Sequence, residues 1–430
     1  MLGPRITGWL TRATPVAFSA YAIFAAFSTY FCMYAFRKPF AAGTFEGQVE
    51  AFGLSMDYKI LLVISQVVGY CLSKFIGIKV ISEMTGARRS IAILAVICSA
   101  WGALLLFPFL PRPWGAIALF LNGLPLGMVW GLVFGFLEGR KVSEALGAGL
   151  SASYILASGV VKAVGRFTME WGVPEEWMPF VTGAIFFVPF CGVVWMLSRL
   201  PPPTKEDEAA RTKREPMDGE ARMRFLKTFA PGIVALTGLY VLLTAYRDFR
   251  DTFAVEIWDA LGYGESPEIL AFSEVPITII VLGTLAALMA IKDNRKALLV
   301  VHGIMLGGTL LIGLSTMAWQ AGLIGPAAWM IAVGLGLYVG YVPYGCVLFD
   351  RLIAATGFIG TAGFLIYVTD AFGYAGSVAL VLYKNFGQAT LSWLDFFVGF
   401  SYATFGVCSI AFLISLVYFA RKTRGVVAAA

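Results

Sequence analysis

Ten ionisable residues lie inside long apolar stretches of this sequence, where a charge is costly. Such side chains usually face a cavity or one another and carry function. They are Arg37, Lys38, Lys74, Lys162, Arg247, Asp248, Arg250, Asp251, Glu274 and Asp370. Six of the ten are cationic and four are anionic, which leaves a surplus of two positive charges. Because isolated cations are unfavourable at low dielectric, we expect a bound anion to supply the missing negative charge.

The spacing of these cations and of nearby tyrosines indicates how an anion would be held. Three groups have the spacing of a shared helix face: Tyr30 with Tyr34 and Arg37, Tyr70 with Lys74, and Arg247 with Arg250. Guanidinium forks suit phosphate or carboxylate, and phenol hydroxyls add neutral hydrogen-bond donors. The pattern therefore predicts a site for a phosphate or carboxylate group.

Some of the cations also have a structural interpretation. Arg37 and Lys38 come late in an apolar segment and could extend to the outer interface, and Lys162 could do the same. Lys74 could reach the inner face. The charged residues of 247–251 could neutralise one another at i, i+3 and i, i+4.

The carboxylates admit two roles. Glu274 and Asp370 could be counter-ions that hold helices together, or they could carry protons. Asp251 belongs to the same charge-pairing or proton-coupling class.

The elements that must position these residues are membrane-spanning helices. The 430 residues are 59% hydrophobic and only 13% charged, with a mean hydropathy of +0.80, whereas soluble chains carry about a quarter charged residues. The apolar runs are long and do not alternate in polarity, so helices are favoured over a barrel. We predict an all-α membrane protein of twelve spans. They are 16–40, 58–78, 90–110, 114–137, 146–166, 178–198, 229–251, 269–291, 296–318, 325–348, 357–382 and 395–420.

A charged, proline-containing stretch separates the sixth span from the seventh. We interpret residues 200–227 as a cytoplasmic linker between six-helix bundles at 1–199 and 228–430. The halves are weakly similar: FRxxF ends the first span at Phe36–Phe40 and the seventh at Phe249–Phe253. This repeat pairs Arg37 with Arg250 and suggests two related bundles.

The distribution of loop charges predicts the orientation. Lys and Arg gather in one set of loops, including Arg88, Arg89 and the linker, whereas the loop after the seventh span is acidic. Cationic loops stay in the cytoplasm, so we expect a multi-pass protein of the cytoplasmic membrane with both termini inside. The six cysteines lie in apolar runs and lack CxxC spacing, which favours packing over metal binding. The sequence shows no cofactor, metal or nucleic-acid motif and no catalytic set, so we expect no enzyme.

Several segments resemble a known family. Residues 30–40 (YFCMYAFRKPF) are similar to the first helix of the organophosphate:phosphate antiporters of the major facilitator superfamily, which include the glycerol-3-phosphate and hexose-phosphate transporters. Residues 70–75 (YCLSKF) resemble the second helix of these antiporters, and residues 121–130 (LNGLPLGMVW) the fourth. Residues 79–89 (KVISEMTGARR) partly match the loop between helices two and three. Weaker matches lie at Glu274–Pro276, Tyr341–Pro343 and Gly360–Phe364.

The resemblance implies a major facilitator fold and residue roles. In that family, arginines of helices one and seven grip the phosphate, which assigns Arg37 and either Arg250 or Arg247, with Arg250 favoured by the FRxxF repeat. The lysine of helix two corresponds to Lys74. Where the glycerol-phosphate members have a substrate-contacting histidine, this chain has Ala157, and Lys162 stands one turn further along.

These observations predict a secondary active transporter of a small organic anion. The expected substrate is a phosphate ester, exchanged for inorganic phosphate by alternating access, and the expected state is a monomer in the lipid bilayer. The expected ligands are Arg37, Lys74, Arg250, Arg247, Tyr30, Tyr34, Tyr70, Tyr341 and Lys162. Three alternatives remain open: a proton-coupled anion symporter, a transporter of lipids with anionic head groups, and a membrane sensor that does not transport.

Overall fold

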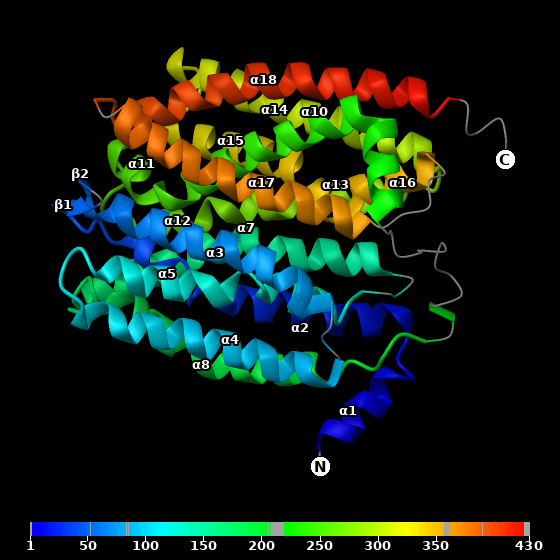
Figure 1. Ribbon diagram of the computed structural model, residues 1–430, viewed down its shortest axis with the longest axis horizontal. Coiled ribbons are helices and arrows are strands. Elements are labelled where there is room, and N and C mark those ends of the chain that lie inside the picture. The colour runs from blue at the N-terminus through cyan, green and yellow to red at the C-terminus, as the bar shows by residue number, and fades with distance from the viewer. Residues whose placement is uncertain are drawn as a thin grey trace. The chain divides into compact units, whose positions relative to one another are not determined.

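The computed structural model describes residues 2–51, 53–82, 84, 86–138, 140, 142–204, 206–207, 219–356, 362–388 and 390–424 (Figure 1). Lys205 and residues 208–218 of the predicted linker lie outside these ranges, as do Gly360 and Thr361 of the last sequence match and Glu83 and Thr85 of the loop match. The described chain is almost entirely helical, and it divides into two compact units.

The first unit comprises Met1–Ala210 and two later segments, Asp251–Phe272 and Val381–Ala389. Its described elements are α1 (Leu2–Leu10), α2 (Pro15–Tyr34), η1 (Pro39–Ala42), β1 (Gln48–Ala51), β2 (Leu54–Asp57), α3 (Tyr58–Ser82), α4 (Gly86–Leu106), η2 (Phe107–Phe109), α5 (Gly115–Leu126), α6 (Val129–Phe134), α7 (Ser143–Glu170), α8 (Met178–Leu197), α11 (Ala254–Ala260), α12 (Ile269–Phe272) and η4 (Tyr383–Gly387). Within it, α2 packs against α7 and α8, and α3 packs against α5.

The second unit comprises Arg211–Arg250, Ser273–Leu380 and Thr390–Ala430. Its described elements are α10 (Gly219–Thr252), which crosses into the first unit at its last residues, α13 (Glu274–Met289), α14 (Asn294–Gln320), α15 (Pro326–Pro343), η3 (Tyr344–Leu348), α16 (Phe349–Thr356), α17 (Ala362–Leu382) and α18 (Trp393–Lys422). Helix α10 is kinked at Phe229, two residues before Pro231, because proline cannot continue the helical hydrogen bonds. Helix α14 packs against both α15 and α18.

Eleven helices in the described part of the chain are long and apolar enough to cross a membrane. They correspond to eleven of the twelve predicted spans. Helix α17 occupies most of the remaining one, 357–382, whose first five residues lie outside the described ranges. The chain is therefore a multi-pass membrane protein of helical bundles. The sequence did not predict the small hairpin of β1 and β2, which pairs Gln48 with Asp57 in antiparallel register.

Glycines allow close helix contacts that position the charged helices. A Cβ on Gly123 of α5 would lie 2.2 Å from the backbone oxygen of Gln66, and one on Gly69 would lie 2.3 Å from that of Phe120. Helices α3 and α5 therefore meet backbone to backbone, as small residues permit in membranes. In the second unit, Gly308 and Gly336 give α14 and α15 the same contact, with Cβ positions 2.5 and 2.4 Å from the opposing oxygen.

Candidate anion-binding residues

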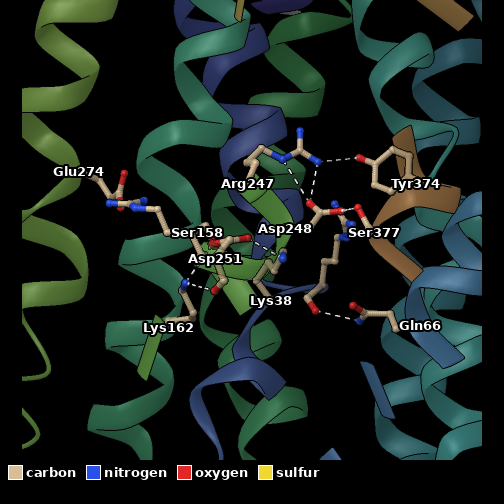
Figure 2. A network of polar contacts seen from close by, with 12 residues as sticks. Lys38, Gln66, Ser158, Lys162, Arg247, Asp248, Asp251, Glu274, Tyr374 and Ser377 are labelled. Carbon is tan, nitrogen blue, oxygen red and sulfur yellow. Dashed lines mark hydrogen bonds and ion pairs between the residues drawn. The ribbon is translucent and has the colours of Figure 1, made fainter. Parts of the chain in front are cut away.

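The first unit holds Arg37 just beyond the end of a helix. Helix α2 ends at Tyr34, and the amide of Arg37 still donates to the oxygen of Tyr34 at 3.0 Å. Two buried amide side chains satisfy the carbonyls that the ended helix leaves open. Gln66 Nε2 donates to the Arg37 oxygen at 2.9 Å (Figure 2), and Asn122 Nδ2 donates to the Phe36 oxygen at 2.8 Å. These contacts fix the backbone from which the Arg37 side chain extends.

Arg37 and Lys74 share one aromatic ring. The guanidinium carbon of Arg37 lies 3.8 Å from the centre of the Tyr70 ring, and the Lys74 ammonium lies 5.3 Å from it. All three residues are buried. Cation–π contact favours each charge separately. However, two cations beside the same ring repel one another, and a negative charge placed near both would attract each of them.

The two predicted tyrosines of α2 lie in an aromatic group. The rings of Tyr30 and Tyr34 are 5.7 Å apart, and Tyr30 contacts Trp130 of α6 edge to face at 5.2 Å. Both tyrosines are buried. Tyr30 and Tyr34 thus lie together on α2, whereas Arg37 lies in the turn that follows the end of this helix.

Asp251 lies between two lysines of the first unit (Figure 2). Its carboxylate is 2.5 Å from the Lys38 ammonium and 2.9 Å from that of Lys162, and Ser158 donates a short hydrogen bond to it. Lys162 also donates to the Asp251 backbone oxygen at 2.5 Å. Lys38 and Lys162 are thus buried in ion pairs and do not extend to an interface.

Further ion pairs of the first unit involve the acidic loop that follows Asp251. Lys59 of α3 pairs with Glu256 of α11, and the two form a short hydrogen bond. Arg166 of α7 lies 4.0 Å from Asp259 and donates to the oxygen of Gly264 at 2.8 Å. Lys59 and Arg166 thus both meet acidic residues of the segment that follows Asp251.

Arg250 is enclosed in the second unit. Its Nη1 donates to Glu274 Oε1 at 2.8 Å, and its Nη2 donates to the oxygen of Met330 at 3.2 Å. A Cβ on Gly334 of α15 would lie 2.6 Å from Arg250 Nη2, so the glycine makes room for the guanidinium. Arg250 therefore joins α10, α13 and α15 in a buried ion pair.

Arg247 lies in a different polar group of the second unit (Figure 2). Its Nε and Nη2 donate to one oxygen of Asp248 at 3.2 and 2.7 Å. Ser377 of α17 donates to the other Asp248 oxygen at 2.8 Å, and Arg247 Nη2 reaches the hydroxyl of Tyr374 at 3.3 Å. The neighbouring carboxylate thus compensates the Arg247 charge.

A chain of hydroxyls connects Arg247 with Asp370 inside the second unit. Arg247 Nη1 donates a short hydrogen bond to the Tyr341 hydroxyl, which lies 3.0 Å from the Tyr240 hydroxyl. Tyr240 donates to Asp370 Oδ1 at 2.7 Å. Because Tyr341 accepts from a guanidinium and Tyr240 donates to a carboxylate, the chain is oriented from Arg247 toward Asp370.

Sequence reasoning missed several members of these groups: Gln66, Ser158, Tyr240, Tyr374 and Ser377. Three of the misses had a signal in the spacing. Tyr240 stands seven residues before Arg247, just as Tyr30 precedes Arg37, and residues 370, 374 and 377 repeat the i, i+4, i+7 pattern. Gln66 and Ser158 had none, because a neutral polar residue in a span is too common to be singled out.

The chain matches one family over most of its length. The sequence model of a family of unknown function, DUF5690, covers residues 39–422. The chain belongs to DUF5690. No curated protein matches the sequence.

Solved structures add the fold. The D-xylose-proton symporter is similar with a TM-score of 0.60 and 15% identity, over 96% of this chain and 99% of that one. A mutant form of a POT peptide transporter, solved in complex with sulfate, has a TM-score of 0.57 and 15% identity over 94% of each chain. The DUF5690 chain thus has the fold of major facilitator transporters, as predicted, and these neighbours do not place it in the organophosphate group. Among its described residues, no cluster of His, Cys, Asp or Glu could hold a metal ion.

Proposed function

We propose that this protein is a secondary active transporter of a small organic anion, and that Arg37, Lys74 and Tyr70 bind the anionic group. The observation that carries the proposal is the pair of buried cations on one ring, with contacts of 3.8 and 5.3 Å. A phosphate or carboxylate beside both would gain a bidentate contact from the guanidinium and a point charge from the ammonium. The transporter fold of the solved neighbours supports the same role.

The backbone of this site is preorganised for such a ligand. Gln66 and Asn122 hold the two carbonyls at the end of α2, so the turn that carries Arg37 is fixed. Gly123 and Gly69 hold α3, with Tyr70 and Lys74, against α5. Because the site is already ordered, binding of an anion costs less conformational entropy.

The finer proposal is exchange of a phosphate ester for inorganic phosphate by alternating access. Its support is the similarity of residues 30–40 and 70–75 to organophosphate:phosphate antiporters. It also has a physical motive. Closure removes water from Arg37 and Lys74, and a bound phosphate would offset part of that cost by pairing with both cations. Obligatory exchange follows when only the loaded site closes.

Counterflow in proteoliposomes tests the proposal. The purified protein is reconstituted with internal phosphate, and uptake of labelled phosphate is compared for wild type, Arg37→Ala, Lys74→Gln and the control Lys296→Gln, an exposed cation of α14. We expect uptake by wild type and control, and losses of at least about tenfold in the other two. Equal uptake by Arg37→Ala and wild type would refute the site. If wild type takes up an organic anion but no phosphate, the proposed exchange for phosphate is refuted, whereas the proposed anion transport is not.

The second candidate function is proton-coupled anion symport. The oriented chain from Arg247 through Tyr341 and Tyr240 to Asp370 favours it. A proton on Asp370 would let the carboxyl group donate to Tyr240, and Tyr240 could then donate to Tyr341, which would accept from both Tyr240 and Arg247. A pH gradient that drives uptake in wild type but not in Asp370→Asn would select symport. Uptake independent of the gradient in both would exclude it.

A further inference from the structure

A shallow groove of about 640 Å³ runs along one face of α18, away from the residues above. Leu413, Ile414, Val417 and Tyr418 line its apolar part, and Arg421 and Lys422 line its end. The three aliphatic residues are 46–56% exposed. The described protein therefore leaves this surface uncovered.

The dimensions of the groove fit one lipid chain. Its residues follow i, i+4, i+8 and i+1, i+5, i+9 spacing, so they form two adjacent rows on one side of the helix. Nine residue steps from Leu413 to Lys422 correspond to about 14 Å at 1.5 Å each. One leaflet contributes about 15 Å of hydrocarbon to a bilayer.

The end of the groove carries two exposed cations. The side chains of Arg421 and Lys422 have no hydrogen bond or ion pair within the described part of the chain. They are not needed to cap α18, because Arg295 donates to the oxygen of Ala420 at 3.4 Å and to Thr423 Oγ1 at 3.2 Å. The Tyr418 hydroxyl is held by the Thr228 oxygen at 3.3 Å. Two cations thus remain available beside a fixed apolar wall.

The first unit shows a different use of an arginine at a helix end. After α8, Arg199 lies 5.6 Å from the centre of the Trp195 ring, and its Nε donates to the Ser198 hydroxyl at 3.1 Å. Arg199 is thus held by neighbouring side chains of its own helix end, whereas the side chains of Arg421 and Lys422 have no such contact among the described residues.

We propose that this groove binds one anionic phospholipid, with an acyl chain along Leu413, Ile414 and Val417 and the phosphate at Arg421 and Lys422. The charge distribution of the loops assigns this end of α18 to the cytoplasmic leaflet, where anionic lipids meet basic residues near helix ends. A phospholipid has both an anionic head group for the two cations and an acyl chain for the apolar surface, which is about as long as one leaflet. A free phosphate would use the cations alone.

Lipid retention tests the proposal. The full-length protein is reconstituted in nanodiscs of phosphatidylcholine with a minor fraction of phosphatidylglycerol, and native mass spectrometry counts the lipids that remain bound after release. One variant, R421Q/K422Q, removes the charges, and another, Val417→Trp, fills the groove and keeps them. The control K292Q/K296Q removes two exposed cations from the segment beside α18.

We expect wild type and control to retain phosphatidylglycerol, and each groove variant to lose about tenfold or more of its affinity. Equal retention by R421Q/K422Q and the control would overturn the proposal, because only general surface charge would then matter. Displacement of the lipid by inorganic phosphate alone, or full retention by Val417→Trp, would also overturn it, because either result would leave the apolar groove without a role.

Discussion

The charged groups of the two units are arranged differently. In the first unit, Arg37 and Lys74 share the ring of Tyr70, Lys38 and Lys162 share the carboxylate of Asp251, and Lys59 and Arg166 pair with Glu256 and Asp259. In the second unit, the described groups contain Arg247 and Arg250 together with the carboxylates of Asp248, Glu274 and Asp370. The first unit thus places two buried cations on one ring, whereas the second places each buried arginine on a carboxylate.

This difference changes the meaning of equivalent residues. The FRxxF repeat makes Arg37 and Arg250 look alike, yet Arg37 lies over a tyrosine beside a second cation, whereas Arg250 is joined to Glu274. Arg37 lies in the turn after α2 and Arg250 lies inside α10, so the repeat fixes neither the local structure nor the partners of the two arginines. The partners determine whether a buried arginine binds ligand or stabilises the bundle.

The largest expected effect is on transport, and it differs between a variant of the first unit and one of the second. Arg37→Ala should lower kcat/KM for the transported anion by about 100-fold or more, because a bidentate charged contact is lost. Arg247→Ala should lower kcat/KM by a smaller factor. The double variant Arg247→Ala/Asp248→Asn should recover part of that loss, because the Asp248 charge that Arg247 compensates is then removed as well. Initial uptake rates in proteoliposomes measure both. Equal losses for Arg37→Ala and Arg247→Ala, with no recovery in the double variant, would contradict the comparison.

The next effect concerns stability in the first unit. Asp251→Asn removes the carboxylate between Lys38 and Lys162, so two buried ammonium groups lose their partner, at a cost of about 3–5 kcal/mol. We expect a clear drop in the midpoint of thermal unfolding in detergent. The matched control is Glu176→Gln, which breaks the exposed pair with Arg112 and should leave the midpoint nearly unchanged. A similar midpoint for the two variants would show that the lysines do not need Asp251.

The sequence predicted the fold well for a physical reason. A span must be a long apolar helix, because lipid offers no partner for backbone groups, so the helices and their approximate limits can be read from composition. The solved neighbours confirm the predicted major facilitator fold. The hairpin of β1 and β2 escaped prediction, because a short strand pair outside the membrane has no such constraint.

Less of the candidate site could be predicted. The buried charges were identified from the sequence, because each is costly in a span, but their partners could not be assigned. Glu274 lies 24 residues from Arg250, and Lys162 lies 89 residues from Asp251, so only the packing of the helices brings them together. The roles assigned to Arg37, Lys74, Arg250 and Arg247 in binding remain predictions.

A double-mutant cycle sharpens the role of Arg250. Arg250→Met and Glu274→Met each leave a buried charge without its partner, at a cost of about 3 kcal/mol or more in unfolding free energy. The double variant should be less destabilised than the sum, because both charges are gone. Thermal unfolding and uptake are measured on all four proteins. Restored stability without uptake would assign Arg250 to the anion, whereas recovery of both would make it a structural counter-ion.

The smallest expected effect tests the hydrogen bonds around Arg247. Tyr374→Phe keeps the ring and removes one contact of 3.3 Å, which is long for a charged hydrogen bond, so uptake should fall by no more than about fivefold. Tyr341→Phe should lower uptake further, because the Tyr341 hydroxyl both accepts from Arg247 and continues the chain to Tyr240 and Asp370. Only Tyr341→Phe should also change the dependence of uptake on pH, since Tyr374 lies outside the chain. A larger loss in Tyr374→Phe would mean that the anion, and not the tyrosine chain, sets the position of Arg247.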